Sequence, residues 1–309
     1  MRIAIVRASP MLTRFNKTLK VLTVFMPSLF FASCMGPEEI LMFDGESARN
    51  FAVQQVEFGP RIPGTQSHAE TAGWISESLE GYGWQVEIQE AENMGHPIKN
   101  IIAKRGQGSP WIIVGAHYDS RMFADQEESP ENATKPVPGA NDGASGVAVL
   151  LELARVFPEE FDGQLWLVFF DAEDNGNIEG WDWILGSQTF VGSLEGKPDV
   201  AVIVDMVGDA DLNIHLEHNS DFSLSLEIWS VAERLGFGSV FIPEKKYQML
   251  DDHLPFIGAG IPSVLIIDFD YPFWHTLEDT PDKISGSSLA AVGETLQHWL
   301  FGRFSITVP

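Results

Sequence analysis

Four short, wholly apolar segments constrain the fold of this 309-residue chain more than any other feature. Apolar runs of this length, without alternation, are typical of strands that are buried on both faces of a sheet. Predicted helices alternate with them, and this order indicates a largely parallel sheet with helices on both faces. The apolar runs are WIIVGA at 111–116, LWLVFF at 165–170, VAVIV at 200–204 and VLII at 264–267, and the predicted helices cover 143–157, 183–193, 221–235 and 286–302.

The segment before the first core strand has its own expected elements. Apolar residues at helical spacing predict helices at 47–58 and 69–79, and two further strands are expected at 84–89 and 100–104. We see no internal repeat, long linker or low-complexity tract. The simplest organisation is therefore a single catalytic domain over residues 46–309.

Polar clusters follow the apolar segments where the strands should end. His117 and Asp119 follow the first segment, Glu173 and Asp174 follow the second, and Asp205 ends the third. In open α/β sheets, ligands bind at the carboxyl ends of the strands. We therefore expect these side chains to meet at one edge of the sheet.

A glycine-rich loop at 139–143 carries Asp142 and leads into an apolar helix. Aspartate before a helix is commonly an N-cap, and this is the simplest interpretation of the residue alone. The surrounding polar clusters favour a second interpretation, in which Asp142 is the central ligand of a metal site.

The adjacent acids Glu173 and Asp174 repel each other and are costly to bury together unless a cation relieves them. A metal would let one acid act as a ligand while the other moves protons. The alternative is a solvated acidic turn, since Asn175 and Gly176 follow.

Histidines complete the candidate ligands. His117 and Asp119 are spaced as a metal ligand and the carboxylate that orients its imidazole, although a structural histidine in a loop has the same spacing. His275 follows Trp274, which would supply an apolar wall. Histidine and carboxylate ligands without thiolate suit catalytic zinc, while spacing alone also admits other divalent ions. The chain has no HExxH, P-loop or GxSxG motif.

Charge separates the N-terminal segment from the rest of the chain. The net charge is −25, which argues against nucleic-acid binding. Residues 1–34 carry five basic side chains and no acid, and include an apolar run at 21–31 followed by Ala-Ser-Cys. This pattern predicts an export signal, and Ala-Ser-Cys resembles the bacterial lipoprotein box, with Cys34 lipidated. An ordinary signal peptide that happens to contain a cysteine is the alternative.

The predicted signal defines the expected location. We expect a periplasmic or cell-surface protein that meets the membrane only through a lipid on Cys34, with residues 35–45 as a tether. Cys34 is the only cysteine, so no intrachain disulfide can form.

The ordered motifs HYDS, GANDGASG, DAED, VDM, DDHLPF and FWHTLEDT resemble the zinc aminopeptidase superfamily and its relatives, the animal-type glutaminyl cyclases. The resemblance spans residues 47–303. It implies a three-layer α/β/α fold with a mixed, mostly parallel central sheet. It also implies peptide or protein N-termini as substrates.

For an aminopeptidase, the resemblance implies two zinc ions and Glu173 as the general base that acts on the metal-bound water. The ligands would be Asp142 as a bridge, His117 and Asp205 for one ion, and Asp174 and His275 for the other.

For a glutaminyl cyclase, the resemblance implies one zinc ion on Asp142, Asp174 and His275. Glu173 would carry a proton from the α-amine of an N-terminal glutamine to the departing ammonia. Asp205 and Asp251 would form an acid network beside it, and Trp274 would line the pocket.

Three features favour the cyclase with one zinc. These are Asp251 in DDHLPF, Trp274 directly before His275, and the segment WDWILGSQTF at 181–190. One departure is Asp174, which stands where the animal cyclases and most aminopeptidases have glutamate. Trp181 and Trp183 could not be assigned to the pocket. A binding protein without turnover is a third possibility, against which Glu173 argues.

Overall fold

A computed structural model describes residues 40–307, in which a six-stranded sheet forms the centre. The strand order is β1-β2-β4-β3-β5-β8. The four strands β4, β3, β5 and β8 run parallel, while β1 and β2 add an antiparallel edge. The strands are β1 Gln85–Asn93, β2 His96–Gln107, β3 Trp111–His117, β4 Gly163–Phe170, β5 Val200–Asp205 and β8 Ser263–Ile267.

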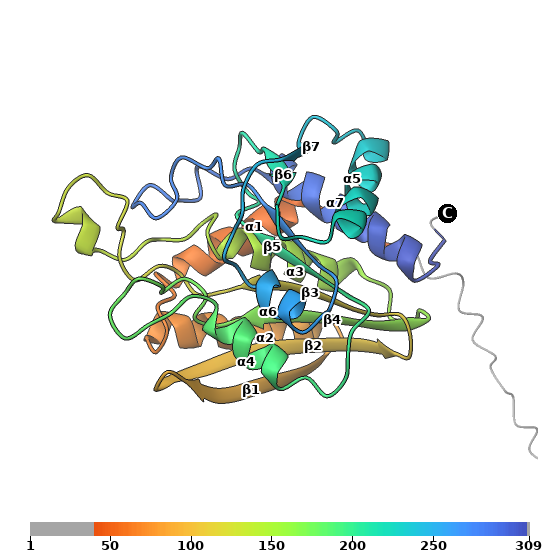
Figure 1. Ribbon diagram of the computed structural model, residues 1–309, viewed down its shortest axis with the longest axis horizontal. Helices are drawn as coiled ribbons and strands as arrows, with labels where there is room; N and C mark the ends of the chain where they lie inside the picture. Colours follow the sequence, from red (N-terminus) through yellow and green to blue (C-terminus); the bar gives the residue numbers. More distant parts are fainter. Residues whose placement is uncertain (1–39, 308–309) are drawn as a thin grey trace, which may run out of the picture. The chain divides into compact units, whose positions relative to one another are not determined.

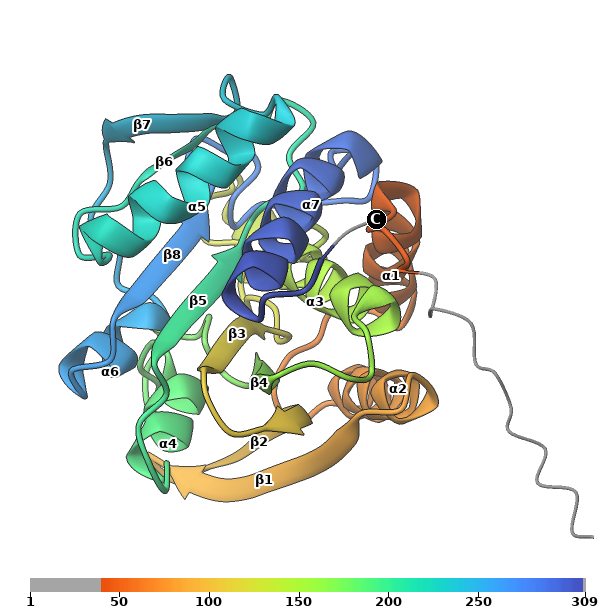
Figure 2. The ribbon, with the colours of Figure 1, turned by 90° about the vertical axis from the view of Figure 1, so that its right-hand side faces the viewer.

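Helices cover both faces of this sheet (Figures 1 and 2). On one face lie α2, α3, α5 and α7, with α1 packed outside α3 and α7; α4 and α6 cover the other face. The predicted three-layer fold with a mixed, mostly parallel sheet is confirmed. The helices are α1 Gly45–Glu57, α2 Gln66–Gly81, α3 Ala144–Val156, α4 Leu185–Gly192, α5 Phe222–Leu235, α6 His253–Gly258 and α7 Gly286–Arg303.

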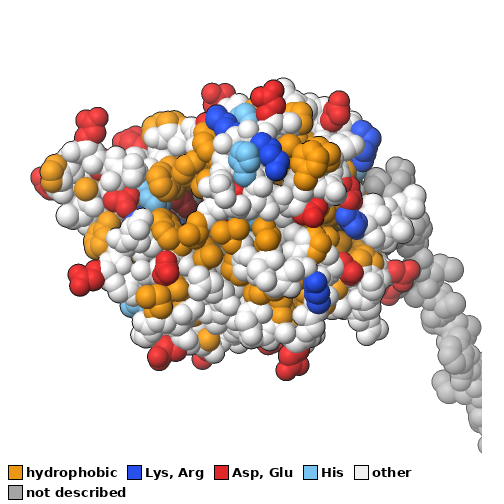
Figure 3. All heavy atoms as spheres, viewed as in Figure 1, with side chains coloured by type: hydrophobic (Ala, Val, Ile, Leu, Met, Phe, Trp, Pro, Cys, Tyr) orange, Lys and Arg blue, Asp and Glu red, His pale blue; other side chains and the backbone are white. Residues whose placement is uncertain are grey.

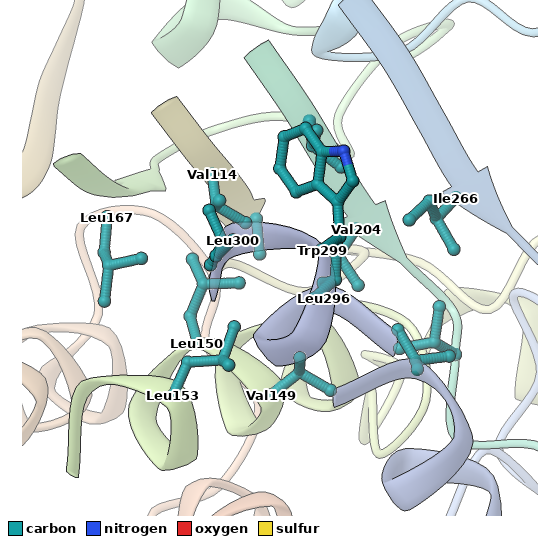
Figure 4. Close-up of a cluster of buried hydrophobic side chains, with 14 of the residues drawn as sticks. Val114, Val149, Leu150, Leu153, Leu167, Val204, Ile266, Leu296, Trp299 and Leu300 are labelled. Carbon is teal, nitrogen blue, oxygen red and sulfur yellow. The ribbon is translucent and has the colours of Figure 1, made fainter. Parts of the chain in front are cut away.

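The apolar strands divide their side chains between two cores. Val114 and Leu167 point to the α3 and α7 side, where they share a cluster with Leu150 of α3 and Leu300 of α7 (Figure 4). Ile113 points to the α4 and α6 side. A fully buried aliphatic side chain contributes about 1.5–3 kcal/mol. Burial on both faces explains why these strands have no alternating pattern.

Several elements differ from expectation, among them α6, which was not one of the predicted helices. A second, two-stranded parallel sheet of β6 Ile214–Leu216 and β7 Phe241–Lys245 was not predicted, because the strands are short. The expected strands at 84–89 and 100–104 are the two arms of one long hairpin. Its turn has φ of 51° at Met94 and 82° at Gly95, as in the tight turns that join hairpin strands. Helix α4 starts at Leu185 rather than at 183.

The chain before α1 already packs against the domain. Phe43 is buried, and its backbone N–H donates to Gln297 Oε1 at 2.9 Å. Gln297 Nε2 in turn donates to the Leu41 carbonyl at 2.8 Å. The Asp44 N–H donates to Glu152 of α3 at 3.0 Å, so the end of the segment predicted as a tether at 35–45 is held by both α7 and α3. The predicted export signal and Cys34 lie outside the described residues and stay predictions. Over 40–307, no helix has the length and apolar character needed to cross a membrane.

Candidate active site

Two strand ends and one helix start bring the first group of ligand atoms together. His117 is the last residue of β3, Asp205 is the last residue of β5, and Asp142 lies just before α3. His117 Nε2 lies 3.1 Å from Asp205 Oδ1 and 3.3 Å from Asp142 Oδ1. All three residues are buried, as expected from their positions at the ends of core strands.

A second group shares Asp142. His275 Nε2 lies 2.9 Å from Asp174 Oδ1 and 3.7 Å from Asp142 Oδ2. The two oxygens of Asp142 therefore face two different histidines. The structure thus brings His117, Asp205, Asp174 and His275 together around Asp142.

Asp142 is not a helix cap. Gly143 is the N-cap of α3, with φ of 89°, and no side chain caps this helix. A Cβ at Gly143 would lie 2.4 Å from the Asp119 carbonyl, so the position requires glycine. The Asp142 carboxylate is thus left for the site. Its backbone N–H donates to Asp279 Oδ2 at 3.1 Å.

Asp119 contacts both His117 and the backbone of the predicted acid pair, Glu173 and Asp174. Its Oδ1 lies 3.4 Å from His117 Nδ1 and accepts from the Glu173 N–H at 3.0 Å. Its Oδ2 accepts from the Asp174 N–H at 3.2 Å. One buried carboxylate therefore positions a ligand histidine and the backbone of both acids, beyond the single role predicted for it.

Several residues at the site have a backbone that only glycine adopts without cost. Ala172, Met206 and His275 have φ of 52°, 45° and 56°. Each lies within two residues of a candidate ligand or is one itself. Such conformations cost on the order of 1–3 kcal/mol and persist where the surrounding structure holds them. The loops at the site are therefore held in place by the fold.

A pocket of about 230 Å³ opens onto the two groups. It contains Glu173 and Asp251 together with Trp274, as the sequence predicted, and it also contains Trp183. Trp183 precedes α4 instead of lying within it, so its indole can reach the pocket and lie parallel to the His275 ring at 6.3 Å. Trp274 stacks on His275 from another side, at 3.8 Å.

Comparison with known proteins gives relatives of two activities. A glutaminyl-peptide cyclotransferase of Drosophila melanogaster is 28% identical over 266 residues, covering 73% of this chain and 72% of the relative. The structure of a Bacteroides thetaiotaomicron glutaminyl cyclase bound to N-acetylhistamine is 31% identical with a TM-score of 0.80, covering 87% of this chain and 100% of that one. The structure of a leucine aminopeptidase precursor from the same organism is 32% identical with a TM-score of 0.80, covering 87% and 99%.

The family follows from the sequence itself. Residues 100–300 match peptidase family M28. This chain belongs to that family. Membership makes the protein an M28 enzyme and implies peptide substrates. The cyclase and the aminopeptidase precursor are equally similar, so similarity does not separate the two activities.

The donor atoms fit the divalent metal expected of an M28 enzyme. Asp142 Oδ2 and Asp174 Oδ2 are buried and accept no hydrogen bond from the described protein. Unpaired carboxylate oxygens inside a protein are costly unless a cation satisfies them. Each of the two groups combines one histidine with two carboxylates, a donor set that suits zinc.

Burial and neighbouring charges shift the pKa values of the acids at the site in different directions. Burial raises the pKa of Glu173 well above its usual range, and the nearby charge of Asp174 adds to the effect. Burial also raises the pKa of Asp251 well above its usual range, with help from the charge of Asp205. Burial acts in the same direction at Asp142, but the hydrogen bond and charge of His117 outweigh it and lower the pKa of Asp142. The lowered pKa of Asp142 favours its charged form, as a metal ligand requires, while the raised pKa of Glu173 favours its protonated form.

The sequence did not identify Asp125, which orients His275, the second histidine of the site. Asp125 Oδ1 lies 3.0 Å from His275 Nδ1, the arrangement that Asp119 gives to His117. Burial opposes ionisation of Asp125, but hydrogen bonds with His275 and Arg121 lower its pKa to about 2. Asp125 lies in an acidic loop where several carboxylates could serve equally well by sequence. Its spacing from His275 gives no local signal.

Two further missed residues shape the loop that carries Asp142. The Arg61 guanidinium is fully buried and donates to the carbonyls of Gly139 at 2.6 Å and Asp142 at 3.3 Å. Burial lowers the pKa of Arg61 to about 10. Asp279 accepts from the Asn141 N–H at 2.8 Å on the other side. A buried cation and a buried acid thus fix the loop before α3.

Proposed function

We propose that this protein is a zinc-dependent glutaminyl-peptide cyclotransferase. It would convert an N-terminal glutamine of a peptide to pyroglutamate and release ammonia. The observation that carries the proposal is the small pocket that is lined by Glu173 and Asp251 together with Trp183 and Trp274. A cavity of this size, with aromatic side chains and acids in its lining, favours one polar side chain as its occupant.

Three parts of the chain would share the reaction. Trp183 and Trp274 hold the glutamine side chain, so that its α-amine lies next to its own γ-carboxamide, and the cyclisation is intramolecular. Glu173 takes the proton from the attacking amine and gives it to the departing ammonia. Its raised pKa suits both steps. Asp251 lines the same pocket and supports this proton transfer. Zinc at Asp142, Asp174 and His275 would supply a Lewis acid for the amide carbonyl.

The surface charge suits such a substrate. Acidic side chains lie around the edge of the face in Figure 3, and the whole chain carries a net charge of −25. A negative surface attracts the free ammonium group of a peptide N-terminus. Export to the periplasm or cell surface, with a lipid on Cys34, remains part of the proposal and rests on the sequence alone.

A dinuclear zinc aminopeptidase is the second candidate. The ligand group of His117, Asp142 and Asp205 favours it, because its donor atoms are as close together as those of the other group. Asp142, with one oxygen towards each histidine, has the position of a bridging ligand. Glu173 would then act as the general base for hydrolysis.

The experiment that separates the two uses zinc-loaded protein with Gln-initiated and Leu-initiated peptides, followed by mass spectrometry. We expect loss of ammonia from the Gln peptide without shortening, and about one zinc ion per chain by metal analysis. Release of free leucine with two zinc ions would establish the aminopeptidase instead. No change in either peptide would reject both activities.

A further inference from the structure

A buried arginine, Arg121, lies directly behind the metal ligands. The side chain is 2% exposed, and it forms ion pairs with Asp125 and Asp174. Its Nη1 donates to the carbonyls of Asp174 at 3.0 Å and Gly176 at 2.9 Å. Burying a guanidinium is costly, so each of its hydrogen bonds matters for the local structure.

The other arm of Arg121 reaches the second histidine through a carboxylate. Arg121 Nη2 donates to Asp125 Oδ2, and Asp125 Oδ1 lies 3.0 Å from His275 Nδ1. Through its two terminal nitrogens Arg121 therefore holds two ligands of the same group: Asp174 by its carbonyl and His275 by way of Asp125. Partners that orient ligands commonly change metal affinity 10- to 100-fold.

The Arg121 guanidinium also lies over the ring of Trp183, which lines the pocket. The guanidinium carbon lies 4.9 Å from the centroid of the Trp183 ring. The indole also packs against Gly176, where a Cβ would fall 2.1 Å from it. The Gly176 carbonyl is one of the acceptors of Arg121. Arg121 thus supports Trp183 both by stacking and through the backbone beneath it.

We propose that Arg121 is a positioning residue that sets metal affinity and the shape of the substrate pocket together. The proposal rests on the function proposed above for the pocket. A guanidinium is needed because one terminal nitrogen serves two carbonyls and the other serves a carboxylate, while the same group lies over the Trp183 ring. A lysine ammonium has a single nitrogen and cannot meet all four.

Arg121→Lys tests the proposal, with Arg105→Lys as the matched control. Arg105 is also buried, donates to backbone carbonyls, and stacks on Trp84 with its guanidinium carbon 4.2 Å from the ring centroid, but it lies outside the site. We expect R121K to raise the zinc dissociation constant about 10- to 100-fold, measured by chelator competition. KM for a Gln-initiated peptide should rise about three- to tenfold. R105K should lower the thermal transition and leave both constants unchanged.

Trp183→Phe separates the two effects, because it should raise KM and leave zinc affinity unchanged. If R121K lowers only the thermal transition, or changes only one of the two constants, the proposal is overturned. If R121K does not fold, Asp125→Asn takes its place as the test variant. Loss of the Asp125 carboxylate removes a partner of Arg121, so the zinc dissociation constant and KM should both change. An unchanged KM would contradict the proposal that Arg121 sets metal affinity and pocket shape together.

The zinc measurement needs no turnover. If the wild-type protein converts neither test peptide, the proposed function fails. Chelator competition on R121K still decides whether Arg121 holds the metal ligands.

Discussion

At the scale of single residues, neighbouring acids acquire different chemistry from different contacts. Asp174 has His275 at 2.9 Å, whereas Glu173 accepts no hydrogen bond from a histidine and instead faces the pocket with Asp251. The difference follows from one backbone turn, because Asp119 holds the N–H groups of both residues. Sequence adjacency alone does not say which acid binds metal and which moves protons.

Glu173→Gln should keep the fold and bound zinc but lose about 10²- to 10⁴-fold in turnover, since an amide cannot carry the proton. Steady-state kinetics with a Gln-initiated peptide measures the loss, and metal analysis checks the zinc. Glu179→Gln, an exposed acid in the same loop, should retain full activity. Wild-type turnover by E173Q would remove Glu173 from the mechanism.

At the scale of elements, close packing of α3 against the sheet fixes Asp142. Gly146, in the first turn of α3, lies against the strand ends: a Cβ there would fall 2.3 Å from the Val204 carbonyl and 2.9 Å from Ala116 Cβ. A side chain would have to push α3 away from β5 and would shift the loop before it. The sequence motif is therefore glycine-rich for contact as well as for turn geometry.

Gly146→Ala should lower the free energy of unfolding by about 1–3 kcal/mol, because neither contact can move without shifting a strand. Denaturant titration of the metal-free protein measures this change. Gly73→Ala is the control: it lies on the exposed side of α2 with nothing within 4 Å of the added Cβ. It should be neutral or stabilise the protein by up to ~1 kcal/mol. Equal effects of the two substitutions would contradict the packing argument.

At the scale of the whole molecule, one buried acid joins the small β6–β7 sheet to the pocket loop. Glu217 follows β6, and its carboxylate accepts from the N–H groups of Ser220 at 2.7 Å and Met249 at 3.0 Å. His253 Nε2 lies 3.2 Å from the same carboxylate. Met249 lines the pocket. Peripheral segments are thus tied to the site by a single charged group.

The Glu217 carboxylate should make the free energy of unfolding depend on pH. Burial opposes ionisation of Glu217, but the hydrogen bonds from His253 and the backbone lower its pKa to about 2. Because the pKa of Glu217 is lower in the folded state than its unfolded value of about 4.5, the ionised carboxylate stabilises the folded protein at pH values above about 4.5. This stabilisation is lost as the pH falls towards 2. Glu217→Gln should therefore cost about 1–3 kcal/mol at pH 7. In urea titrations the difference from wild type should narrow below about pH 4.5, and a difference that grows there would contradict the argument.

The sequence predicted the parts of this molecule that repeat a simple pattern. Apolar runs located the four parallel strands, and the polar residues after them located the ligand groups, because strand ends meet at one sheet edge. Apart from Asp119, the residues that support the site were not predictable. Arg61, Arg121 and Asp125 act through backbone carbonyls or through partners far along the chain. Such contacts depend on how loops fold over the sheet, and no spacing rule describes them.

The wide separation of the ligands in the chain also bears on biosynthesis. Asp174 precedes His275 by 101 residues, with two strands of the central sheet between them. The group of Asp142, Asp174 and His275 thus cannot bind an ion during synthesis before residue 275 has been made. If the N-terminal segment directs the chain across a membrane before it folds, zinc must be acquired at the destination. Zinc supply in that compartment would then limit how much active protein accumulates, whatever the rate of translation.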